Sequence, residues 1–510
     1  MIYSRLKHLL SKVRAEEIRQ GLFFNSRMNA APRVVNTSFC PRYHPIRGTG
    51  VYDTSGGLLD LDGVWHVWED DGGWSHFASH DLVHWSGSLL NGTGFGGLTG
   101  SISPTSSGVY ALWKQGMGTG PPIVSAVATS PISGPFRGAS QWQHRGPSIL
   151  KPASATKFGD ASRAFRYPSV NGSWWAGVGC GHADTGAGFC LFQADDDTLQ
   201  HFTDSGTLFS APHTYGSKDD DVVWSPVNIS TTIWECPDLF PLGDSGRWVL
   251  LGSLLKTNQW WVGKLQGMPP RFVAEAVGIL DWGNGYAARS GGGWIQTSSD
   301  RRLLWSFTGW VAPSFPTECG RALIIPRDLR LRGTFLEVEP IPEIALLRKS
   351  STRRVVRLQG PNGIGLASEE THDVAAGAQV EIRVLCNLSA SALHTNGSVA
   401  VRTLATADGR AYTEVGVDFG VDSRNMYADH SRCCAKPNSV VQRAPLAAGN
   451  WFELLVLVDG GMIESFSSGV ALTPLVAPDD TATPADDRLT TVVNSLPGAT
   501  CEVQSWQLAL

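Results

Sequence analysis

The chain has 510 residues, enough for two or three domains with a large buried core. Only 17% of the residues are charged and the formal net charge is −5. These totals give no reason to expect nucleic acid as a partner, since nucleic acid would need a basic face. No stretch reaches the roughly 18 consecutive apolar residues of a membrane-spanning helix, so a membrane is not an expected partner either.

Tryptophan is abundant at 19 residues, and 57 Gly and 29 Pro accompany it. Many aromatic residues among many turn formers are typical of an all-β protein. Exposed Trp would also suit the faces of sugars, although a single Trp more often belongs to a core. The nine cysteines are an odd number, so at least one has no partner within the chain, and none forms a C-x-x-C zinc pattern.

Residues 1–38 are interpreted as an N-terminal extension. Leu6, Leu9, Leu10 and Val13 have helical spacing. Lys and Arg interrupt any apolar signal-peptide core, and the acidic pair at 16–17 does not fit a transit peptide. Six Asn-x-Ser/Thr sequons hint at a secretory ancestry, so the localisation is left open.

Residues 39–335 read as a succession of short strands separated by Gly, Pro, Asp and Ser, with no helix between them. Such an order argues against a parallel α/β fold. The turns SHDLVHW (79–85) and DDTLQHF (196–202) resemble each other and favour a β-propeller, in which one turn recurs per blade. A sandwich with similar hairpins is the alternative. The clearest strand candidates are VYALW, IVSAVATS, WWAGVG, FCLFQA, WVLLGSLL, WWVGKL and RLLWSFTGWV.

The sequence pattern changes after IPRDLRL (325–331). Residues 336–349 form a Pro-punctuated linker, and residues 350–510 alternate between apolar and polar residues with a period of two. Such alternation predicts half-buried antiparallel strands, and their spacing fits a β-sandwich.

The segment TTIWECPDLF (231–240) places Glu235 between Trp234 and Cys236. Apolar neighbours disfavour an ionised carboxylate, raise its pKa and keep a proton available near neutral pH. A glycosidase needs one such acid and a second carboxylate that acts as nucleophile or base. Glu235 is therefore a candidate catalytic acid, and an ordinary solvated carboxylate at a strand end is the alternative.

At these residues the sequence resembles glycoside hydrolase family 32, which contains the invertases (β-fructofuranosidases), fructanases and plant fructosyltransferases. WECPDLF resembles the family's acid/base motif, and the other collinear matches cover nearly the whole chain from about residue 40. They are WSHFASHDLVHW (74–85), LTGSIS (98–103), LDWGNGYAARS (280–290), RRLLWSFTGWV (301–311), IPRDLRL (325–331) and VDGGMIESF (458–466).

The resemblance implies an all-β chain, with a five-bladed propeller that carries the active site and a β-sandwich behind it. It implies hydrolysis of sucrose or related fructosides by a retaining two-carboxylate mechanism, with a small carbohydrate as partner and no cofactor or metal. By the same resemblance a secreted or vacuolar location is an option, although no clear signal peptide is present.

The resemblance assigns Glu235 as the acid/base and Asp53, in GVYDTSG (50–56), as the nucleophile. A turn aspartate before Ser-Gly-Gly is the alternative for Asp53. The remaining substrate-pocket candidates are Arg166, Tyr167, Asp238, Trp74 and Trp85. For Asp238, a bond to backbone amides that fixes its loop is an equal alternative.

The family's Arg-Asp-Pro motif aligns with FRYPSV (165–170), which puts Tyr167 where a transition-state-stabilising aspartate is expected. Tyr carries no negative charge near neutral pH. Losing such a group commonly lowers the rate by about 10²–10³. Activity is therefore expected to be impaired, and a catalytically inactive sugar-binding or interaction protein is the competing hypothesis. A carboxylate from Glu69, Asp70 or Asp71 is a further option for that role.

No two of the histidines at 76, 80, 84 and 182 lie on a predicted helix in H-x-x-x-H placement with an acidic partner. Solvated or core histidines are therefore expected there, rather than metal ligands.

Overall fold

A computed structural model describes residues 39–45, 53–70, 74–88, 99–106, 108–116, 122–128, 142–210, 234–254, 257–293, 300–308, 319, 321–361, 369–390, 392–420, 423–434, 441–478 and 483–509. The chain divides into Met1–Thr37 and one compact unit, Ser38–Leu510. The N-terminal extension predicted at 1–38 lies outside the described residues. Within them, no helix has the length and apolar character to span a membrane.

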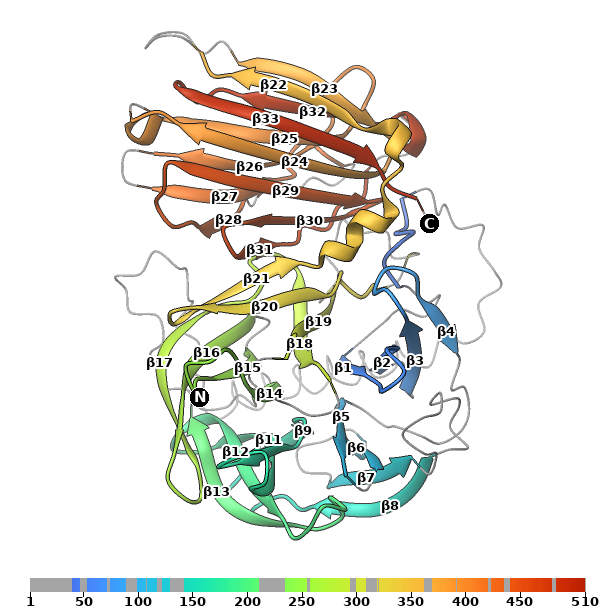
Figure 1. Ribbon diagram of the computed structural model, residues 1–510, viewed down its shortest axis with the longest axis vertical. Helices are drawn as coiled ribbons and strands as arrows, with labels where there is room; N and C mark the ends of the chain where they lie inside the picture. The colour runs from blue at the N-terminus through green and yellow to red at the C-terminus, as the bar shows by residue number, and fades with distance from the viewer. Residues whose placement is uncertain are drawn as a thin grey trace, which may run out of the picture. The chain divides into compact units, whose positions relative to one another are not determined.

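The first half of the unit is a series of five antiparallel sheets, each built from consecutive strands (Figure 1). The first sheet is β1 (Thr54–Leu59), β2 (Trp65–Asp70), β3 (Trp74–Ser79) and β4 (Ser86–Ser88). The second is β5 (Gly100–Thr105), β6 (Gly108–Lys114), β7 (Ile123–Ala128) and β8 (Trp142–Ile149). The third is β9 (Lys157–Ala161), β10 (Phe165–Tyr167), β11 (Ser173–His182), β12 (Gly186–Ala194) and β13 (Phe202–Ser210). The fourth is β14 (Glu235–Pro241), β15 (Trp248–Leu254), β16 (Thr257–Gln266) and β17 (Arg271–Ile279), and the fifth is β18 (Gly285–Gly291), β19 (Leu303–Thr308), β20 (Arg327–Arg332) and β21 (Phe335–Pro340).

The innermost strands of these sheets form a ring. Each of β1, β5, β9, β14 and β18 contacts the next in that order, and β18 contacts β1 in turn. Figure 1 shows these five strands facing a common centre. The ring closes where the Leu59 N–H donates to the Gly292 carbonyl at 3.0 Å. Only glycine fits at the crossing, because a Cβ on Gly291 would lie 2.1 Å from the Gly57 carbonyl oxygen.

The blades pack against one another through both faces of their strands. Strand β2, WHVWED, is buried along its whole length, as expected for strands covered on both sides. Among the described residues, five tryptophans are less than 2% exposed: Trp68, Trp175, Trp234, Trp261 and Trp305. These members of the large Trp set therefore belong to the core and do not form sugar-binding surfaces.

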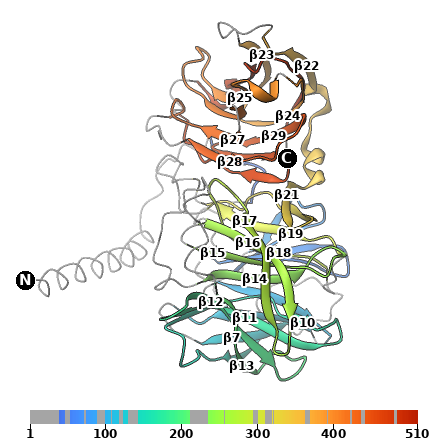
Figure 2. The ribbon, with the colours of Figure 1, turned by 90° about the vertical axis from the view of Figure 1, so that its left-hand side faces the viewer.

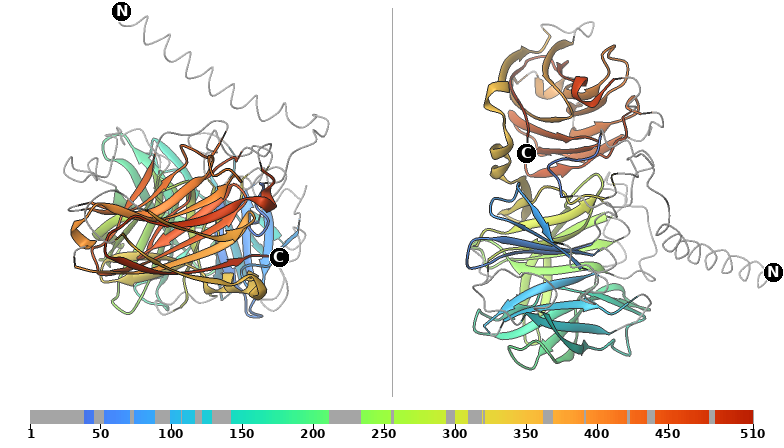
Figure 3. Two further views of the ribbon diagram at one scale, coloured as in Figure 1. Left: turned by 90° about the horizontal axis from the view of Figure 1, so that it is seen from above. Right: turned by 90° about the vertical axis from the view of Figure 1, so that its right-hand side faces the viewer.

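The second half of the unit is a pair of six-stranded antiparallel sheets (Figure 2; Figure 3, right). One sheet has the order β22 (Arg354–Gln359), β33 (Ala499–Gln507), β24 (Gln379–Leu388), β29 (Trp451–Asp459), β30 (Met462–Ser467) and β31 (Val470–Leu472). The other has the order β23 (Glu370–Ala376), β32 (Leu489–Asn494), β25 (Gly397–Ala405), β26 (Thr413–Phe419), β27 (Arg424–Asp429) and β28 (Gln442–Pro445). Short 3₁₀ turns are η4 (Pro342–Leu347), η5 (Ser350–Thr352), η6 (Ala392–His394) and η7 (Ala485–Asp487).

The inward-facing apolar residues of both six-stranded sheets form one core, which includes Val380, Ile382, Val384, Val399 and Val401. They are the residues whose period-two alternation predicted this domain. The sheets thus fit the predicted propeller and sandwich. The predicted boundaries at 335 and 350 stay predictions; the last propeller sheet ends at Pro340 and the first sandwich strand begins at Arg354.

The odd cysteine of the sequence is Cys236, which is buried and free. The other eight form the pairs Cys40–Cys319, Cys180–Cys190, Cys386–Cys501 and Cys433–Cys434. Burial raises the pKa of the Cys236 thiol well above its usual range, so it stays a neutral thiol.

Candidate active site

Three acidic side chains come from the innermost strands of three blades. Asp53 directly precedes β1, Asp160 lies in β9 and Glu235 opens β14. The Cys236 N–H, next to Glu235, donates to Asp160 Oδ2 at 3.0 Å. Asp53 and Asp160 both raise the pKa of Glu235, and Asp160 also raises that of Asp53. The three carboxylates therefore interact as one cluster at the centre of the ring.

Glu235 has the environment of a proton donor. Burial raises its pKa to about 7, and the negative charges of Asp160 and Asp53 act in the same direction. The Tyr286 hydroxyl donates to Glu235 Oε2, and this hydrogen bond and Lys114 oppose the rise. Near neutral pH a substantial fraction of Glu235 is consequently protonated.

Asp53 has hydrogen bonds that fix its position. The Thr99 hydroxyl donates to Asp53 Oδ2, and the Asp70 N–H donates to the Asp53 carbonyl at 3.0 Å. Burial, followed by the charge of Asp160, raises the pKa of Asp53 from its ordinary value. The Thr99 hydrogen bond and the charges of Arg289 and Arg321 oppose that shift and favour the carboxylate form.

Backbone irregularities aim two of the acids at the centre. Asp160 has φ +61° and Cys236 has φ +48°, which are uncommon values for residues other than glycine. The pairing of β9 with β11 and that of β14 with β15 both shift register at these positions. Such β-bulges re-aim side chains and often lie next to active sites.

A buried guanidinium holds the two bulges together. Arg289 Nη1 on β18 donates to the carbonyls of Ala161 and Pro237, both at 2.8 Å. These carbonyls follow Asp160 and Cys236 directly in the chain. Arg289 therefore fixes the spacing of the two irregular strands and places a positive charge near Asp53.

Comparison with known proteins identifies the family of this chain. The sequence model described as "Glycosyl hydrolases family 32 N-terminal domain" matches residues 63–340, more than half of the 510 residues. The chain belongs to glycosyl hydrolase family 32. The resemblance noted in the motifs is thereby confirmed, and at the level of the family the chain is an enzyme of the glycoside hydrolase class.

Similar sequences and structures cover most of this family 32 chain. A levanase of Bacillus sp. (strain L7) is 26% identical over 496 residues, 86% of this chain but 49% of the levanase. The sucrose:sucrose 1-fructosyltransferase of Festuca arundinacea is 25% identical over 467 residues, 78% of this chain and 67% of that protein. The chain thus spans about half the length of the levanase and two thirds of the transferase.

The fold is also found among solved structures. Fructan 1-exohydrolase IIa from Cichorium intybus superimposes with a TM-score of 0.75 at 19% identity, over 93% of this chain and 98% of that one. A β-fructofuranosidase of Aspergillus kawachii superimposes with a TM-score of 0.72 at 18% identity. The predicted all-β class, a propeller with a sandwich, is confirmed by these neighbours and by the sheets of this chain.

Of the predicted site residues, the structure brings Asp53 and Glu235 together. Asp238 is buried and its oxygens accept from the Leu239 N–H at 3.0 Å and the Ser290 N–H at 2.7 Å. This contact is the loop-fixing alternative considered for Asp238. Trp74 lies opposite Asp70, at the Asp53 end of the first blade, but is only 3% exposed within a core cluster.

Arg166 and Tyr167 lie away from the three acids, contrary to the expected pocket role beside Glu235. Arg166 pairs with Asp197 at 2.9 Å and stacks on Trp174. The Tyr167 ring packs on Trp248, which pairs with Pro241 at the far end of β14 from Glu235. Pro241 lies six positions along the strand from Glu235, on the order of 20 Å away. The physical reason is that β10 pairs with the start of β11, whereas β9 pairs with its end.

Trp85 is also distant from the acids. Its indole N–H donates to the Leu82 carbonyl at 2.9 Å within the turn between β3 and β4. That turn follows Ser79, which pairs with Trp65 and, through it, with Leu59 at the end of β1 opposite to Asp53. Trp85 therefore helps to fold the turn.

Sequence reasoning missed Asp160, Thr99 and Tyr286. Asp160 is the single acid in KFGDASRAF, seven residues before Tyr167, and its position beside the quoted FRYPSV motif was an available signal. Tyr286 lies in the matched segment LDWGNGYAARS and Thr99 in LTGSIS, so both were near quoted motifs. The hydrogen bonds of Thr99 to Asp53 and of Tyr286 to Glu235 join different blades, so they could be found only in the folded structure.

Glu69 is a second buried acid in this region. It is 0% exposed and pairs across the sheet with Thr54, directly after Asp53. Neither of its oxygens has a hydrogen-bond partner among the described residues, although the Thr54 side chain acts to lower its pKa. Burial and the neighbouring charges of Asp53 and Asp70 raise its pKa well above the usual range. Burial therefore favours the neutral form of Glu69, and the option that it supplies the missing carboxylate stays a prediction.

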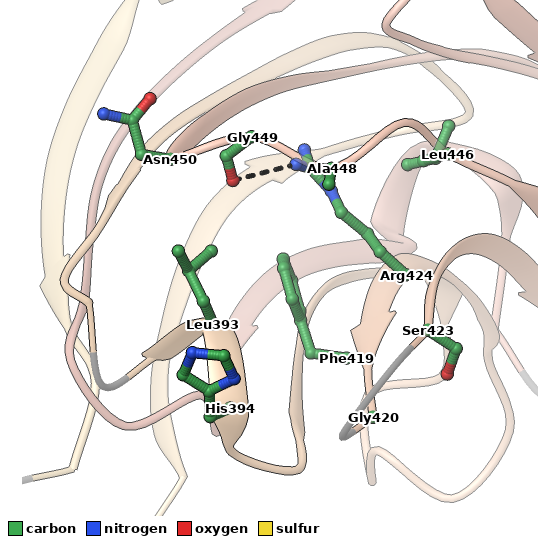
Figure 4. A pocket seen from close by; sticks show the side chains of 10 residues that line it. All are labelled: Leu393, His394, Phe419, Gly420, Ser423, Arg424, Leu446, Ala448, Gly449 and Asn450. Atoms are coloured by element: carbon green, nitrogen blue, oxygen red, sulfur yellow. Dashed lines mark hydrogen bonds between the residues drawn. The ribbon is translucent and has the colours of Figure 1, made fainter.

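A cavity of about 550 Å³ lies in the sandwich (Figure 4). Arg424 donates from this cavity to the Gly449 and Trp451 carbonyls at 3.4 and 3.3 Å, which ties down the loop before β29. The cavity is lined by residues of the sandwich strands and loops alone, so it is separate from the acidic cluster.

The hydrogen bond from Tyr286 to Glu235 gives a prediction about pH. Because this bond favours the ionised carboxylate, Tyr286→Phe is expected to raise the pKa of Glu235 above its value of about 7. The descending alkaline limb of kcat/KM should then move to higher pH. A pH–rate profile for both proteins measures this, and a limb that stays in place or moves to lower pH would contradict the assignment.

Proposed function

We propose that this family 32 chain is a retaining glycoside hydrolase that acts on β-linked fructosides such as sucrose or a fructan. Three observations support the proposal: two carboxylates occupy the motif positions, Asp160 interacts with both of them, and burial raises the pKa of Glu235 to about 7. The last observation carries it, because a glycosidase needs a carboxyl group that is still protonated near neutral pH.

In the proposed reaction, the carboxylate of Asp53 attacks the anomeric carbon of the fructosyl unit. Glu235 gives its proton to the leaving oxygen, so the glycosidic bond breaks as a covalent fructosyl–Asp53 ester forms. Glu235, now ionised, takes a proton from water or from an acceptor hydroxyl, which attacks the same carbon and releases Asp53. The overall configuration at that carbon is retained.

We assign the third acidic role to Asp160 in place of Tyr167. Asp160 is buried, is held by the Cys236 N–H and interacts with both Asp53 and Glu235. An ionised carboxylate there would accept hydrogen bonds from sugar hydroxyls, which charge makes stronger than neutral ones. With Asp160 in this role, Tyr167 gives no reason to expect impaired turnover. The main argument for an inactive sugar-binding protein, the lack of an aspartate at position 167, then no longer applies.

The substrate class rests on the relatives. Their names include a levanase, a sucrose:sucrose 1-fructosyltransferase and a sucrose-6-phosphate hydrolase, and each implies a fructosyl donor. Hydrolysis and transfer differ only in whether water or a sugar hydroxyl reacts with the covalent intermediate. We therefore propose fructosyl donors as substrates for this chain.

The purified chain should release fructose when it is incubated with sucrose, levan or inulin, as measured by chromatography. Asp160→Asn is expected to lower the rate about 10²- to 10³-fold, because it removes one preorganised charged group. Tyr167→Phe is the matched control and should leave the rate unchanged.

Two results would overturn parts of the proposal. If the folded native chain releases no fructose from any of these substrates, the enzymatic function is wrong. If Tyr167→Phe lowers the rate as much as Asp160→Asn does, the assignment of the third acid is wrong while the function stands.

A further inference from the structure

A cysteine–cysteine–histidine cluster lies in the third blade. Cys180 and His182 are two residues apart on β11 and therefore share one face of the sheet. Cys190 on β12 pairs with Val178, which lies on that same face. His182 Nε2 is 3.4 Å from Cys180 Sγ and 3.5 Å from Cys190 Sγ. All three side chains are buried, at 0%, 8% and 1% exposure for Cys180, His182 and Cys190.

The orientation of His182 is that of a metal ligand. Its Nδ1 lies 3.2 Å from the Ser154 carbonyl, which can only accept, so Nδ1 carries the hydrogen. In a neutral ring the Nε2 lone pair then points at the two sulfurs. A backbone carbonyl on the other ring nitrogen is the usual support of a metal-bound histidine. A disulfide offers no proton to this lone pair, and within the described part of the chain the hydroxyl that can donate to it is that of Thr207, at 3.4 Å.

The distances fit a tetrahedral ion. Bonds of about 2.3 Å to sulfur and 2.0–2.1 Å to nitrogen, at a tetrahedral angle, place the two atoms about 3.5 Å apart. Both Nε2–Sγ distances match this value. Thr207 Oγ1, at 3.4 Å from Nε2, lies at the separation expected for an oxygen ligand at another corner. Only the two sulfurs, which are bonded to each other in the structure, would have to separate, to about 3.8 Å.

We propose that the reduced form of this cluster binds one zinc-class divalent cation through Cys180, Cys190 and His182, with Thr207 or water as the fourth ligand. A dithiol reduces the disulfide, giving it two electrons and two protons and itself becoming a cyclic disulfide. When the cation binds, each thiol releases its proton to solvent and the two thiolates and the imidazole bind the metal. The site thus exists in two forms, a disulfide and a metal centre.

The cluster differs from the other cysteine pairs of the chain. Among the described residues it is the only group of three or more His, Cys, Asp or Glu side chains whose ligand atoms lie within 4.8 Å of one another. Sequence spacing did not reveal it, because the three residues meet through strand register and not through a C-x-x-C or helical pattern. The Cys180 carbonyl also accepts from the Trp234 N–H at 3.4 Å, next to Glu235.

Cobalt(II) is the probe for this site, since thiolate-to-cobalt charge-transfer absorption reports Co–S bonds. The full chain is purified without oxygen in the presence of a dithiol, which is removed before one equivalent of Co²⁺ is added. We expect one cobalt per chain, displaced by Zn²⁺, and no binding by the oxidised protein. His182→Ala keeps all thiols and is expected to bind at least about 10-fold more weakly.

The outcome separates the metal centre from a simple disulfide. Cys180→Ala/Cys190→Ala should lose the absorption, whereas Cys386→Ala/Cys501→Ala, which removes another pair, should keep it. Circular dichroism of every protein shows whether it is folded. Absence of the charge-transfer band from the folded, reduced native chain, or equal affinity in His182→Ala, would overturn the proposal. Neither readout depends on fructosidase activity.

Discussion

Replacing Glu235 with glutamine is expected to lower the rate of fructose release from sucrose about 10²- to 10⁴-fold, the usual contribution of general acid–base catalysis. Glutamine has nearly the same shape but cannot give its proton to the leaving oxygen. The loss should be smaller for an aryl fructoside, whose leaving group departs without protonation. Steady-state kinetics on both substrates measure the two effects.

The pH dependence provides a second test of Glu235. The acid works in its protonated form, so activity should fall as pH rises through about 7, the pKa to which burial raises this group. Glu235→Gln has no such group, and its residual activity should lose this limb.

Glu339 is the matched control for that profile. Burial raises its pKa to about 7 as well, but it lies on β21, at the outer edge of the fifth blade. Glu339→Gln should therefore leave the alkaline limb unchanged. If Glu339→Gln removes the limb, or if Glu235→Gln retains it, the titrating acid is not Glu235.

The same raised pKa has a consequence for stability. A carboxyl whose pKa is higher in the folded chain than in the unfolded chain binds its proton more strongly when folded, so its contribution to stability falls as pH rises from about 4.5 to 7. Glu235→Gln should consequently unfold at a higher temperature than the native chain at pH 8. Loss of activity together with a gain in stability would show that the acid is retained for catalysis.

The sequence predicted the parts of this site that lie in continuous motifs. Glu235 was found because its neighbours Trp234, Cys236 and Pro237 are distinctive, and Asp53 because GVYDTSG aligns with the family's nucleophile motif. Asp160 was missed for a physical reason. Its side chain reaches the centre through a β-bulge with a positive φ, and neither feature has a composition signal in KFGDASRAF.

The same distinction holds for the fold. Period-two alternation predicted the strands of the sandwich, since one face of each is covered and one is not. It could not predict which strands become neighbours: Cys180, His182 and Cys190 form a cluster only because β11 and β12 pair with Val178 opposite Cys190. Likewise, the closure of the ring depends on the contact of Gly57 with Gly291, two residues far apart in the chain.

Arg327→Met is expected to lower the free energy of unfolding by about 3–5 kcal/mol, because it removes the cation from a buried ion-pair network and leaves the carboxylates in place. Arg327 is fully buried on β20 of the fifth blade. It donates to Asp281 at 2.7 Å, to Glu464 of the sandwich at 2.7 Å and to the Thr473 hydroxyl at 2.7 Å. Removing the guanidinium leaves two buried carboxylates without their main counter-charge.

His44 supplies a second positive charge to the buried network of Arg327. Burial lowers the pKa of His44, but its hydrogen bonds to Asp459 and Glu464, both 2.8 Å, raise it to about 9. A protonated His44 therefore shares Glu464 with Arg327. After Arg327→Met this single positive charge faces three buried carboxylates, Asp281, Asp459 and Glu464, and cannot neutralise them all.

Arg301 offers a matched control for Arg327. It also pairs with two carboxylates, Asp328 at 2.7 Å and Glu343, but its side chain is 37% exposed. Because water solvates the partners when the arginine is removed, Arg301→Met should lower the free energy of unfolding by no more than about 1 kcal/mol. Denaturant titrations of the native chain and both variants measure the difference.

Arg327→Lys separates charge from geometry in this network. Lysine keeps the positive charge, but its compact ammonium cannot reach Asp281, Glu464 and Thr473 at once as the planar fork does. We therefore expect Arg327→Lys to lower the free energy of unfolding by more than Arg301→Met and by less than Arg327→Met. If Arg327→Met lowers the free energy of unfolding no more than Arg301→Met does, burial does not strengthen the Arg327 ion pairs. Apolar packing alone would then hold the propeller against the sandwich.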